Sequence, residues 1–419
     1  MKILVVGGGG REHALVWKIS QSPRVKKIYC APGNGGISEL AECVDIAAAD
    51  VDGMVRFAKE SNIDLTVVAP EDPLALGMVD ALEDAGLKAF GPKRDAAVIE
   101  SSKVFAKNLM KKYGIPTAEY RIFDDYLKAL GYAEEAYYPI VIKAEGLALG
   151  KGVIIANDIN EANKTLKSMM LDNVFGQAGR RVVIEEYLTG SEVTVMVFTD
   201  GKNFVPMVSA QDHKRVYDDD KGPNTGGMGA FSPSRMYTPA IARQVEETII
   251  KPTVKAMADE GRSFKGVLYF GLMLTDQGPK VLEYNARFGD PETQVVLPRL
   301  KTDIVDVFEA VVEERLERMD IRWDDGAAVC VILASGGYPG AYKRGYPITG
   351  LESLLEDPRV TVFHSGTRKE GREYYTNGGR VLGVTAVAPE LGSAIDRVYE
   401  SVRKIHFQDM HYRRDIGRK

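Results

Sequence analysis

The sequence predicts a multidomain protein of mixed α/β and α+β class. It has an N-terminal α/β domain built on a doubly wound parallel sheet, a central core and a small C-terminal α+β domain. Three observations predict this. A short aliphatic run at residues 2–6 leads through glycines into a helical pattern, as buried parallel strands do. Pairs of apolar runs then enclose glycine-rich loops. After Trp323, several strand patterns precede a single helical one.

The composition favours an ordinary globular protein. The chain has 419 residues, 45% hydrophobic and 27% charged, with a formal net charge of −5. A negative net charge argues against binding to nucleic acid or to anionic membranes. The three cysteines are scattered and odd in number, which fits a reducing compartment. No apolar run is long enough for a signal peptide or a membrane span, so we expect a cytoplasmic protein. Because the chain stops soon after Gly417, we also expect no fused later pathway enzyme.

The first element is a strand over Lys2–Val6, followed by the turn Gly7–Gly10 and a helix. A glycine turn at a helix N-terminus can bind an anion through free backbone N–H groups. The dinucleotide-binding fingerprint fails, because Glu12 or His13 occupies the third glycine position. The second strand, Lys27–Cys30, is followed by no acid that could hold a ribose. A phosphate loop and a plain structural turn therefore both remain open.

A third strand, Asp64–Ala69, ends just before Glu71. Ligands of doubly wound sheets lie beyond the carboxyl ends of strands, so Glu71 is a candidate for sugar hydroxyls. An acid that stabilises a helix N-terminus is the alternative. Residues 95–113 are predicted to form one helix, on which Lys103 and Lys107 lie one turn apart on a solvated face.

Two further strands, Pro139–Lys143 and Gly152–Ala156, enclose the loop Ala144–Lys151. Small residues allow the backbone to approach an anion, and a lysine stands at each end of the loop. It is not a Walker loop, because Gly152 stands where a hydroxyl residue is required. The pattern favours a phosphate-covering loop, with a plain hairpin as the alternative.

The strand Arg181–Leu188 is followed, after a break, by the strand Glu192–Phe198. The backbone of such a connection can pair with the edge of an adenine, and Glu192 can hold ribose hydroxyls. For Glu185 and Glu186, solvation at a strand end is the alternative interpretation.

The polar segments Gln211–Arg215 and Gly222–Gly229 form a long loop region, which we expect to contact substrate. The three aspartates at 218–220 between them are predicted to be a solvated turn. An amphipathic helix over Ile241–Glu260 and a buried strand over Gly266–Leu274 follow.

The stretch from Val281 to Thr293 is the most informative in the chain. Val281, Glu283 and Asn285 are spaced by two and are expected on one face of a strand. A carboxylate and an amide oxygen side by side suit a hard cation such as Mg²⁺. Arg287 follows and can offer a fork of donors to a phosphate. A half-exposed edge strand with a polar face is the alternative.

Taken together, these motifs resemble those of the phosphoribosylamine–glycine ligase (glycinamide ribonucleotide synthetase) family, which belongs to the ATP-grasp superfamily. The resemblance spans the whole chain. It rests on residues 9–15, 142–152, 211–215, 222–229, 285–294 and 377–380.

The resemblance implies an ATP-grasp core with a mobile lid at about residues 120–190. It divides the chain into residues 1–101 (phosphoribosyl binding), 102–325 (ATP-grasp) and 326–419 (C-terminal α+β). It implies ATP-dependent ligation of glycine to 5-phosphoribosylamine in purine biosynthesis, through a glycyl phosphate. Mg²⁺ or Mn²⁺ would be the cofactor, and we expect a monomer with no nucleic-acid or membrane partner.

The resemblance also implies roles for individual residues. Catalytic roles fall on Arg287, Asp212 and Lys214, and metal binding on Glu283 and Asn285. ATP binding falls on Lys103, Lys143, Gly146, Gly150, Lys151, Gly152, Glu185, Glu186, Tyr187, Leu188 and Glu192. Substrate binding falls on Gly9, Gly10, Glu71, Asn224, Thr225, Gly226, Gly227 and Met228.

Two alternatives stay open. One is another ATP-grasp carboxylate–amine ligase of nucleotide metabolism. The residues at 9–15 and 211–215 speak against a carboxylase with the same plan. The other is a nucleotide-binding regulatory protein that has lost catalysis. That protein would be expected to have lost Glu283, Asn285 or Arg287, and all three are present.

Overall fold

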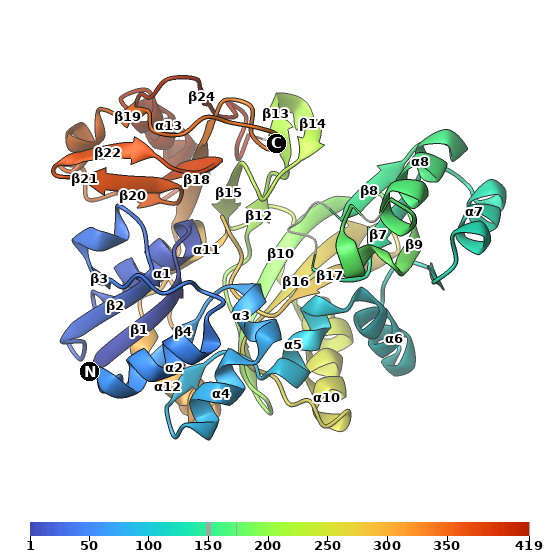
Figure 1. Cartoon of the computed structure of the whole chain (residues 1–419), viewed down its shortest axis with the longest axis horizontal. Helices are drawn as coiled ribbons and strands as arrows, with labels where there is room; N and C mark the ends of the chain where they lie inside the picture. The colour runs from blue at the N-terminus through green and yellow to red at the C-terminus, as the bar shows by residue number, and fades with distance from the viewer. Residues whose placement is uncertain (148–151, 173, 419) are drawn as a thin grey trace.

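A computed structural model describes residues 1–147, 152–172 and 174–418 of the chain. Figure 1 shows an N-terminal unit in blue, a central sheet with a lid projecting to one side, and a C-terminal unit in orange and red above the N-terminal unit. This arrangement confirms the predicted class, with a parallel sheet at the N-terminus and a small α+β unit at the C-terminus.

The N-terminal unit holds a five-stranded sheet in the order β3-β2-β1-β4-β5, with every pairing parallel. Along β1, Ile3 and Val5 join one apolar core, and Leu4 and Val6 join another. Both faces of the sheet are therefore covered, as the continuous aliphatic run predicts. The elements are β1 (Lys2–Gly7), α1 (Gly10–Ile19), β2 (Lys27–Pro32), β3 (Glu42–Cys43), α2 (Val51–Glu60), β4 (Leu65–Val68), α3 (Glu71–Leu76), α4 (Met78–Asp84), β5 (Ala89–Phe90) and α5 (Arg94–Ser101).

The helix predicted over residues 95–113 is two helices, so that prediction was wrong. α5 ends at Ser101, and α6 covers Lys103–Tyr113. Ser102 between them is extended (φ −130°, ψ 107°), and its hydroxyl accepts the N–H of Phe105 at 3.1 Å. Serine stabilises a helix start in this way at some cost to a helix interior, so the break has a local cause.

The central unit is an antiparallel sheet in the order β11-β10-β16-β17. Its strands are β10 (Ser191–Asp200), β11 (Phe204–Pro206), β16 (Lys265–Thr275) and β17 (Gly278–Asn285), and its helices are α6, α9 (Pro239–Val245), α10 (Lys251–Asp259), α11 (Thr293–Val296) and α12 (Ile304–Val312). The helix predicted over residues 241–260 contains a wider π-helical turn at Glu246–Ile250. Pro252 follows this turn and has no N–H to donate to it.

The lid is a second antiparallel sheet, in the order β6-β9-β7-β8, with its own apolar core. Figure 1 shows it at the side of the molecule, away from the C-terminal unit. Its elements are β6 (Tyr120–Phe123), α7 (Tyr126–Glu135), β7 (Ile140–Ala144), β8 (Val153–Ala156), α8 (Ile159–Met170) and β9 (Val182–Glu186). A separate core allows the lid to move as one body relative to the central sheet.

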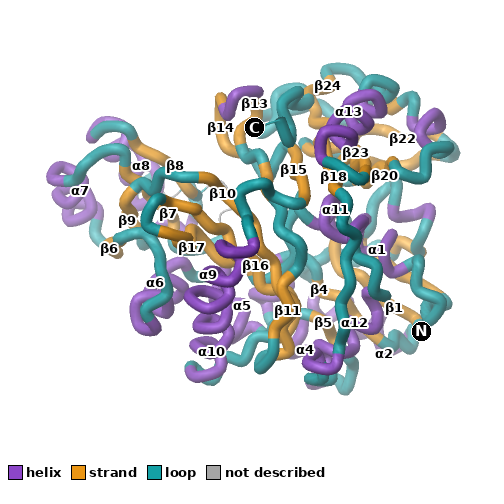
Figure 2. Tube along the Cα trace, turned by 180° about the vertical axis from the view of Figure 1, so that it is seen from behind, coloured by secondary structure: helices purple, strands orange, loops and turns teal. Residues whose placement is uncertain are grey.

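The C-terminal unit is built on the sheet β12-β15-β18-β23-β20, with β24 also paired to β18 (Figure 2). Two of these strands come from the central part of the chain, so the sheet crosses the boundary predicted at residue 326. The elements are β12 (Gln211–Asp212), β13 (Arg215–Tyr217), β14 (Lys221–Asn224), β15 (Gly229–Ser232), β18 (Ala327–Ser335), β19 (Pro347–Ile348), β20 (Val360–His364), β21 (Thr367–Glu370), β22 (Glu373–Thr376), β23 (Arg380–Ala388), α13 (Leu391–Val402) and β24 (Met410–His411).

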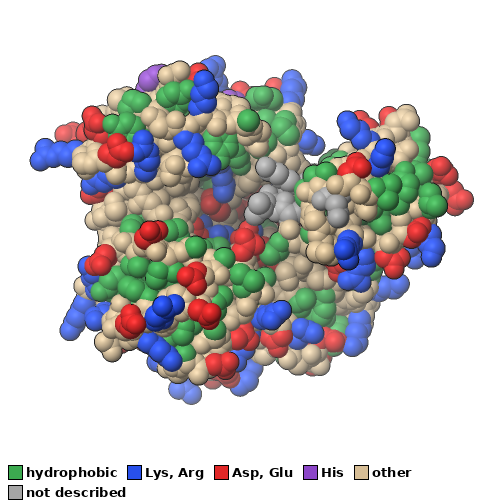
Figure 3. Space-filling view, viewed as in Figure 1, with side chains coloured by type: hydrophobic (Ala, Val, Ile, Leu, Met, Phe, Trp, Pro, Cys, Tyr) green, Lys and Arg blue, Asp and Glu red, His purple; other side chains and the backbone are tan. Residues whose placement is uncertain are grey.

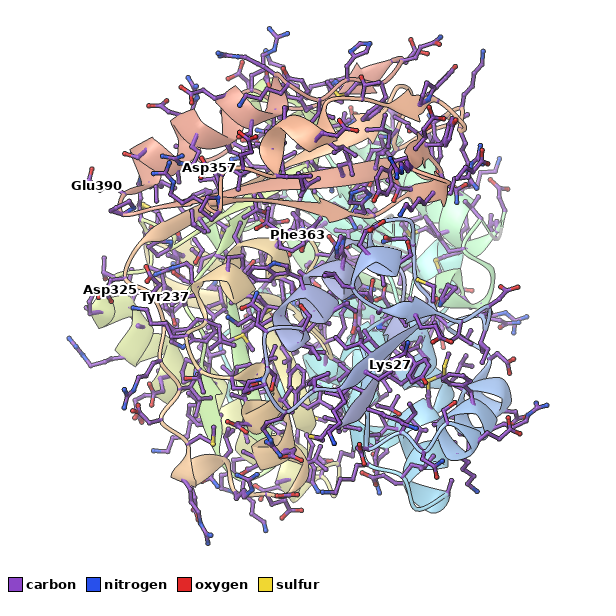
Figure 4. All side chains as sticks on the ribbon, turned by 90° about the vertical axis from the view of Figure 1, so that its left-hand side faces the viewer. Lys27, Tyr237, Asp325, Asp357, Phe363 and Glu390 are labelled. Atoms are coloured by element: carbon purple, nitrogen blue, oxygen red, sulfur yellow. The ribbon has the colours of Figure 1, made fainter. Side chains whose placement is uncertain are left out.

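Aromatic contacts join the C-terminal unit to the N-terminal unit. Phe363, labelled in Figure 4 where the two units meet, makes edge contacts with His13 and Trp17 of α1. Their ring centroids lie 5.8 and 5.7 Å from that of Phe363. This packing places β20 beside α1, and with it the glycine turn that precedes the helix.

Candidate active site

The candidate site lies in a hollow between the three units. Figure 3 shows the surface hollowed between the C-terminal and N-terminal units, with acidic and basic side chains on its floor. β17 runs into this region and carries Glu283 and Asn285. The expected alternation fails at one point, because the register shifts between Gly271 and Leu272 of β16 and Leu282 forms a bulge. Val281 therefore lies in the apolar core, and the prediction that it shares a face with Glu283 was wrong.

The ionisation of Glu283 is favoured by cations. Burial opposes its charge, but Lys214, Lys143, Lys103 and Arg287 lower its pKa below the usual range. Asn285 pairs with Tyr269 of β16, and β16 offers no acid between Tyr269 and Leu274. The pair thus offers one ionised carboxylate and one amide oxygen.

Two lysines on the ATP side link the lid to the core. Lys103 of α6 donates to the carbonyl oxygen of Gly146 in the lid at 3.1 Å. Lys143 of β7 donates to the carbonyl oxygen of Leu282 at 3.0 Å. Burial lowers the pKa of Lys103, and Glu283 opposes that shift. Of the other predicted loop residues, Gly152 accepts the N–H of Ala144, while Gly150 and Lys151 lie outside the described residues.

Glu185 is the centre of a buried ion cluster. One of its carboxylate oxygens lies 3.0 Å from Nζ of Lys107 and 3.0 Å from Nζ of Lys143. All three side chains are at most 7% exposed. The solvated face predicted for Lys107 was therefore wrong, because β9 of the lid covers it. The other carboxylate oxygen of Glu185 is buried and has no hydrogen-bond partner among the described residues.

The connection after β9, where adenine binding was predicted, carries a small apolar cluster. Leu188 packs with Met273, Ala118 and Leu282 in a small apolar cluster that can contact a flat ring. Glu186 is exposed and accepts the N–H of Glu119 at 3.0 Å, and Tyr187 is exposed.

Asp212 and Lys214 lie close enough to Glu283 for their charges to interact with it. Nζ of Lys214 donates to the carboxylate of Glu192 at 2.9 Å. Glu192, predicted to hold ribose hydroxyls, therefore forms an ion pair with Lys214 in this structure. Burial disfavours the charge of Lys214, but Glu192, Asp212 and Glu283 raise its pKa well above the usual range. Burial raises the pKa of Asp212 to about 7, with Lys214 opposing the shift. A carboxylate with a pKa near neutrality is suited to exchange a proton.

A buried network that sequence reasoning missed lies behind this pair. The hydroxyl of Tyr269 donates to the carboxylate of Glu292 at 2.8 Å, and Thr194 lies within 3.2 Å of both groups. Glu292 also contributes to the raised pKa of Asp212. Glu292 falls within the motif at residues 285–294, but only the fold places it against β10 and β16.

Arg287 is held between two acids. Its Nε lies 3.2 Å from Glu71 and one terminal nitrogen lies 3.1 Å from Glu100. Burial opposes ionisation of Glu71, but Arg287 and Arg11 lower its pKa to about 2. Glu100, a further residue that the sequence did not single out, also accepts the N–H of Ala286 at 2.7 Å. The arrangement fixes the plane of the Arg287 guanidinium at the end of β17.

The glycine turn is occupied by protein carboxylates. The N–H of Gly9 donates to Glu12 at 2.6 Å, and the Asp290 carboxylate accepts the N–H of Arg11. A Cβ at Gly10 would lie 2.5 Å from the Ser365 hydroxyl, so a larger residue there would have to displace that side chain. These contacts are those of a structural turn, which is one of the two roles that the sequence left open. A phosphate would have to displace the carboxylates.

The loop Asn224–Met228 is tied to the C-terminal unit. The N–H of Gly226 donates to the hydroxyl of Tyr338 at 3.0 Å. The carbonyl oxygen of Gly226 accepts a hydrogen bond from Arg380 at 2.7 Å. Arg380 also lies 3.0 Å from the carboxylate of Asp290. The Met228 side chain is fully buried in an apolar cluster, so only its backbone can reach a ligand.

Family models match nearly the whole chain. The phosphoribosylglycinamide synthetase N domain matches residues 1–100, the ATP-grasp (A) domain 101–293 and the C domain 328–419. The chain belongs to this family. Family membership confirms the resemblance drawn from the sequence motifs.

Named relatives of the family agree with this assignment. A phosphoribosylamine–glycine ligase of Caldanaerobacter subterraneus subsp. tengcongensis is 51% identical over 100% of this chain and 99% of its own length. That of Halalkalibacterium halodurans is 51% identical over 100% and 97%. The crystal structure of phosphoribosylamine–glycine ligase from Thermotoga maritima matches with a TM-score of 0.87 and 32% identity, covering 99% of this chain and all of that one.

The fold is shared more widely. The biotin carboxylase domain of Hydrogenobacter thermophilus 2-oxoglutarate carboxylase, solved with ADP and magnesium, matches with a TM-score of 0.76 at 18% identity, covering 98% of this chain and 91% of that one. The family's core is thus an ATP-grasp fold. No helix in the described part of the chain has the length and apolar character needed to cross a membrane.

The chemistry of the donor set fits a magnesium ion that is completed by a nucleotide. Within residues 1–147, 152–172 and 174–418, no group of three or more His, Cys, Asp or Glu side chains could hold a metal by itself. Mg²⁺ commonly uses one or two protein oxygens together with waters and substrate phosphates. Glu283 and Asn285 supply that number of oxygen donors.

Proposed function

We propose that this protein catalyses the ATP-dependent ligation of glycine to 5-phosphoribosylamine, giving glycinamide ribonucleotide, ADP and phosphate. The main observation in support is that one cleft brings Lys103 of the core, Lys143 of the lid and the Asp212–Lys214 pair together around Glu283. Membership of the family and relatives of about half identity over the full length support the same substrates.

The first step forms an acyl phosphate. A carboxylate oxygen of glycine attacks the γ-phosphorus of ATP, and the bond to the β,γ-bridging oxygen breaks to release ADP. Lys103, Lys143 and the loop from Gly146 to Gly152 bind the phosphates, while Leu188 and its neighbours hold the adenine. Glu283 and Asn285 hold Mg²⁺ or Mn²⁺, which supplies charge neutralisation when it is bound. Arg287, fixed by Glu71 and Glu100, faces the charge that develops on the transferred group.

The second step forms the amide. The amine nitrogen of phosphoribosylamine attacks the glycyl carbonyl carbon, and the carbon–oxygen bond to phosphate breaks. The amine must lose a proton, and Asp212 is placed to accept it because its pKa is about 7. Lys214 then faces the oxygen on which negative charge gathers. Glu71 and the loop Asn224–Met228 contact the phosphoribosyl group and the glycine.

The test measures ADP release from purified protein with ATP, Mg²⁺ and freshly made phosphoribosylamine, with and without glycine. Release that requires both glycine and phosphoribosylamine is the expected result. Release with another carboxylate or with bicarbonate would keep ATP-grasp chemistry and overturn the substrate. Tight ATP binding with no ADP from any acid would favour a regulatory protein.

A further inference from the structure

The hairpin β13–β14 connects the two polar segments of the proposed site. Lys214 immediately precedes β13, and Asn224 is the last residue of β14. The two strands pair only with each other among the described strands. A two-stranded hairpin is marginally stable by itself, and its turn contains three adjacent aspartates whose charges repel. Something outside the hairpin must hold its shape.

The segment from Met410 to Arg418 lies against this hairpin, and Figures 1 and 2 both show that end of the chain beside β13 and β14. The side chain of Arg413 is fully buried. It donates to the carbonyl oxygen of Arg215 at 3.0 Å and to the carboxylate of Asp220 at 2.9 Å. Two further donors, at 2.8 and 2.7 Å, engage both oxygens of Asp415. One guanidinium thus binds the start of β13 and the end of the turn.

Neighbouring contacts extend this clamp along the hairpin. His411 lies 2.8 Å from the carbonyl oxygen of Val216. The N–H of Arg414 donates to Asp218 at 2.7 Å, and the N–H of Asp219 donates to Asp415 at 2.9 Å. The turn is exposed at Asp219 and Asp220, as expected, and it is also bound to the C-terminal segment.

The clamp is itself anchored on the C-terminal unit. The hydroxyl of Tyr399 on α13 donates to the carbonyl oxygen of Arg413 at 2.9 Å and accepts the N–H of Ile416 at 3.0 Å. β24 pairs with β18 of the large sheet. The hairpin is thereby fixed to a rigid body instead of being free to move with the loop.

At the base of the hairpin, the contacts lead directly into the proposed site. Thr225 donates its N–H and its hydroxyl to the carbonyl oxygen of Lys214, both at 2.8 Å. The N–H of Met228 donates to His213, and Lys214 reaches Glu192 across the cleft. A displaced hairpin would carry the backbone of Lys214 with it.

We propose that Arg413 is a positioning residue for the ligation, which holds the β13–β14 hairpin so that Lys214 and the loop Asn224–Met228 face the amine substrate. This inference rests on the proposed function. Arg413 has no proposed contact with ATP, because the lysines proposed to bind ATP lie on α6 and β7. Loss of the clamp should therefore weaken use of phosphoribosylamine more than use of ATP.

The experiment compares Arg413→Met and Arg413→Lys with wild type. For Arg413→Met, kcat/KM for phosphoribosylamine should fall about tenfold or more, because hydrogen bonds to charged groups are lost, while KM for ATP stays near wild type. Arg413→Lys should recover part of the loss, since lysine keeps the charge but not the bidentate geometry. Trypsin should cleave faster after Lys221, whose side chain is 74% exposed. Arg397→Met is the matched control, because it breaks an ion pair with Asp357 on the same unit at 2.5 Å.

If Arg413→Met fails to fold, Asp220→Asn provides the second test. It removes the ion pair between the hairpin and Arg413 and leaves the Arg413–Asp415 pair intact. Equal losses for ATP and phosphoribosylamine, or unchanged kinetics and unchanged cleavage after Lys221, would overturn the inference. A wild-type protein that releases no glycine-dependent ADP would instead overturn the proposed function, and faster cleavage after Lys221 would still report the clamp.

Discussion

The buried cluster of Lys107, Glu185 and Lys143 makes a quantitative prediction about ATP. Both lysines lie 3.0 Å from one carboxylate oxygen of Glu185. When Lys143 turns to a phosphate, Lys107 remains to neutralise Glu185. In Lys107→Met, the same movement would leave a buried carboxylate without a partner, which is costly. ATP binding would then have to offset that cost.

The size of the effect follows from the contact that is lost. A hydrogen bond to a charged group contributes about 1.5 to 3 kcal/mol. That energy corresponds to a rise in KM for ATP of roughly 10- to 150-fold. The measurement is initial-rate kinetics at varied ATP with glycine and phosphoribosylamine saturating. Lys111→Met is the control, because Lys111 is exposed on the same helix.

The pH dependence gives an independent check. Burial lowers the pKa of Lys107 to about 8, with Glu185 opposing the shift. Lys107 is therefore charged below that pH and loses its charge above it. Wild-type KM for ATP should rise as the pH passes upward through 8 and approach that of Lys107→Met, in which this step is absent. An unchanged KM in the variant, or the same pH step in both proteins, would refute the reasoning.

Three further predictions concern the chemical steps and the lid. Glu283→Gln should abolish turnover while ATP binding without metal survives in part, as calorimetry with and without Mg²⁺ would show; full turnover would disprove the metal assignment. Asp212→Asn should lower kcat by about 10² to 10⁴. Because the pKa of Asp212 is about 7 and its protonated form accepts no proton, wild-type kcat should fall below pH 7. A flat wild-type profile would contradict its role as a base. ATP with Mg²⁺ should protect residues 120–190 from proteolysis, and equal cleavage with and without nucleotide would count against lid closure.

Elements specified by local pattern were predictable from the sequence. The aliphatic runs at Lys2–Val6 and Ala327–Ala334 are observed as β1 and β18, within one residue at each end. Their residues are buried on both faces, so every position carries the same signal. The wider motif around Glu283 was also found, because its polar residues interrupt an otherwise apolar strand.

Features that depend on a distant partner were not predictable. Lys107 and Glu185 are 78 positions apart in sequence and meet only because the lid folds over α6. The aspartates at 218–220 lie in an exposed turn, as expected, but nothing near them in sequence indicates their contacts with Arg413 and its neighbours. The bulge at Leu282 depends on the register with β16, and a strict period of two cannot reveal it. The sequence patterns identified the charged residues but could not show that the fold buries them.

If Lys103 and Lys143 bind the phosphates of ATP as proposed, their two contacts across the lid couple ATP binding to the position of the lid. Lys103 belongs to the core and binds a lid carbonyl, that of Gly146, while Lys143 belongs to the lid and binds a core carbonyl, that of Leu282. Each lysine therefore donates a hydrogen bond to the other unit, Lys103 to the lid and Lys143 to the core. A nucleotide phosphate between them must compete with both carbonyls, and its stronger charge-assisted bonds favour the exchange. Since both contacts cross the same boundary, the proposed phosphate binding would exchange the bonds that set the lid's position for bonds to ATP.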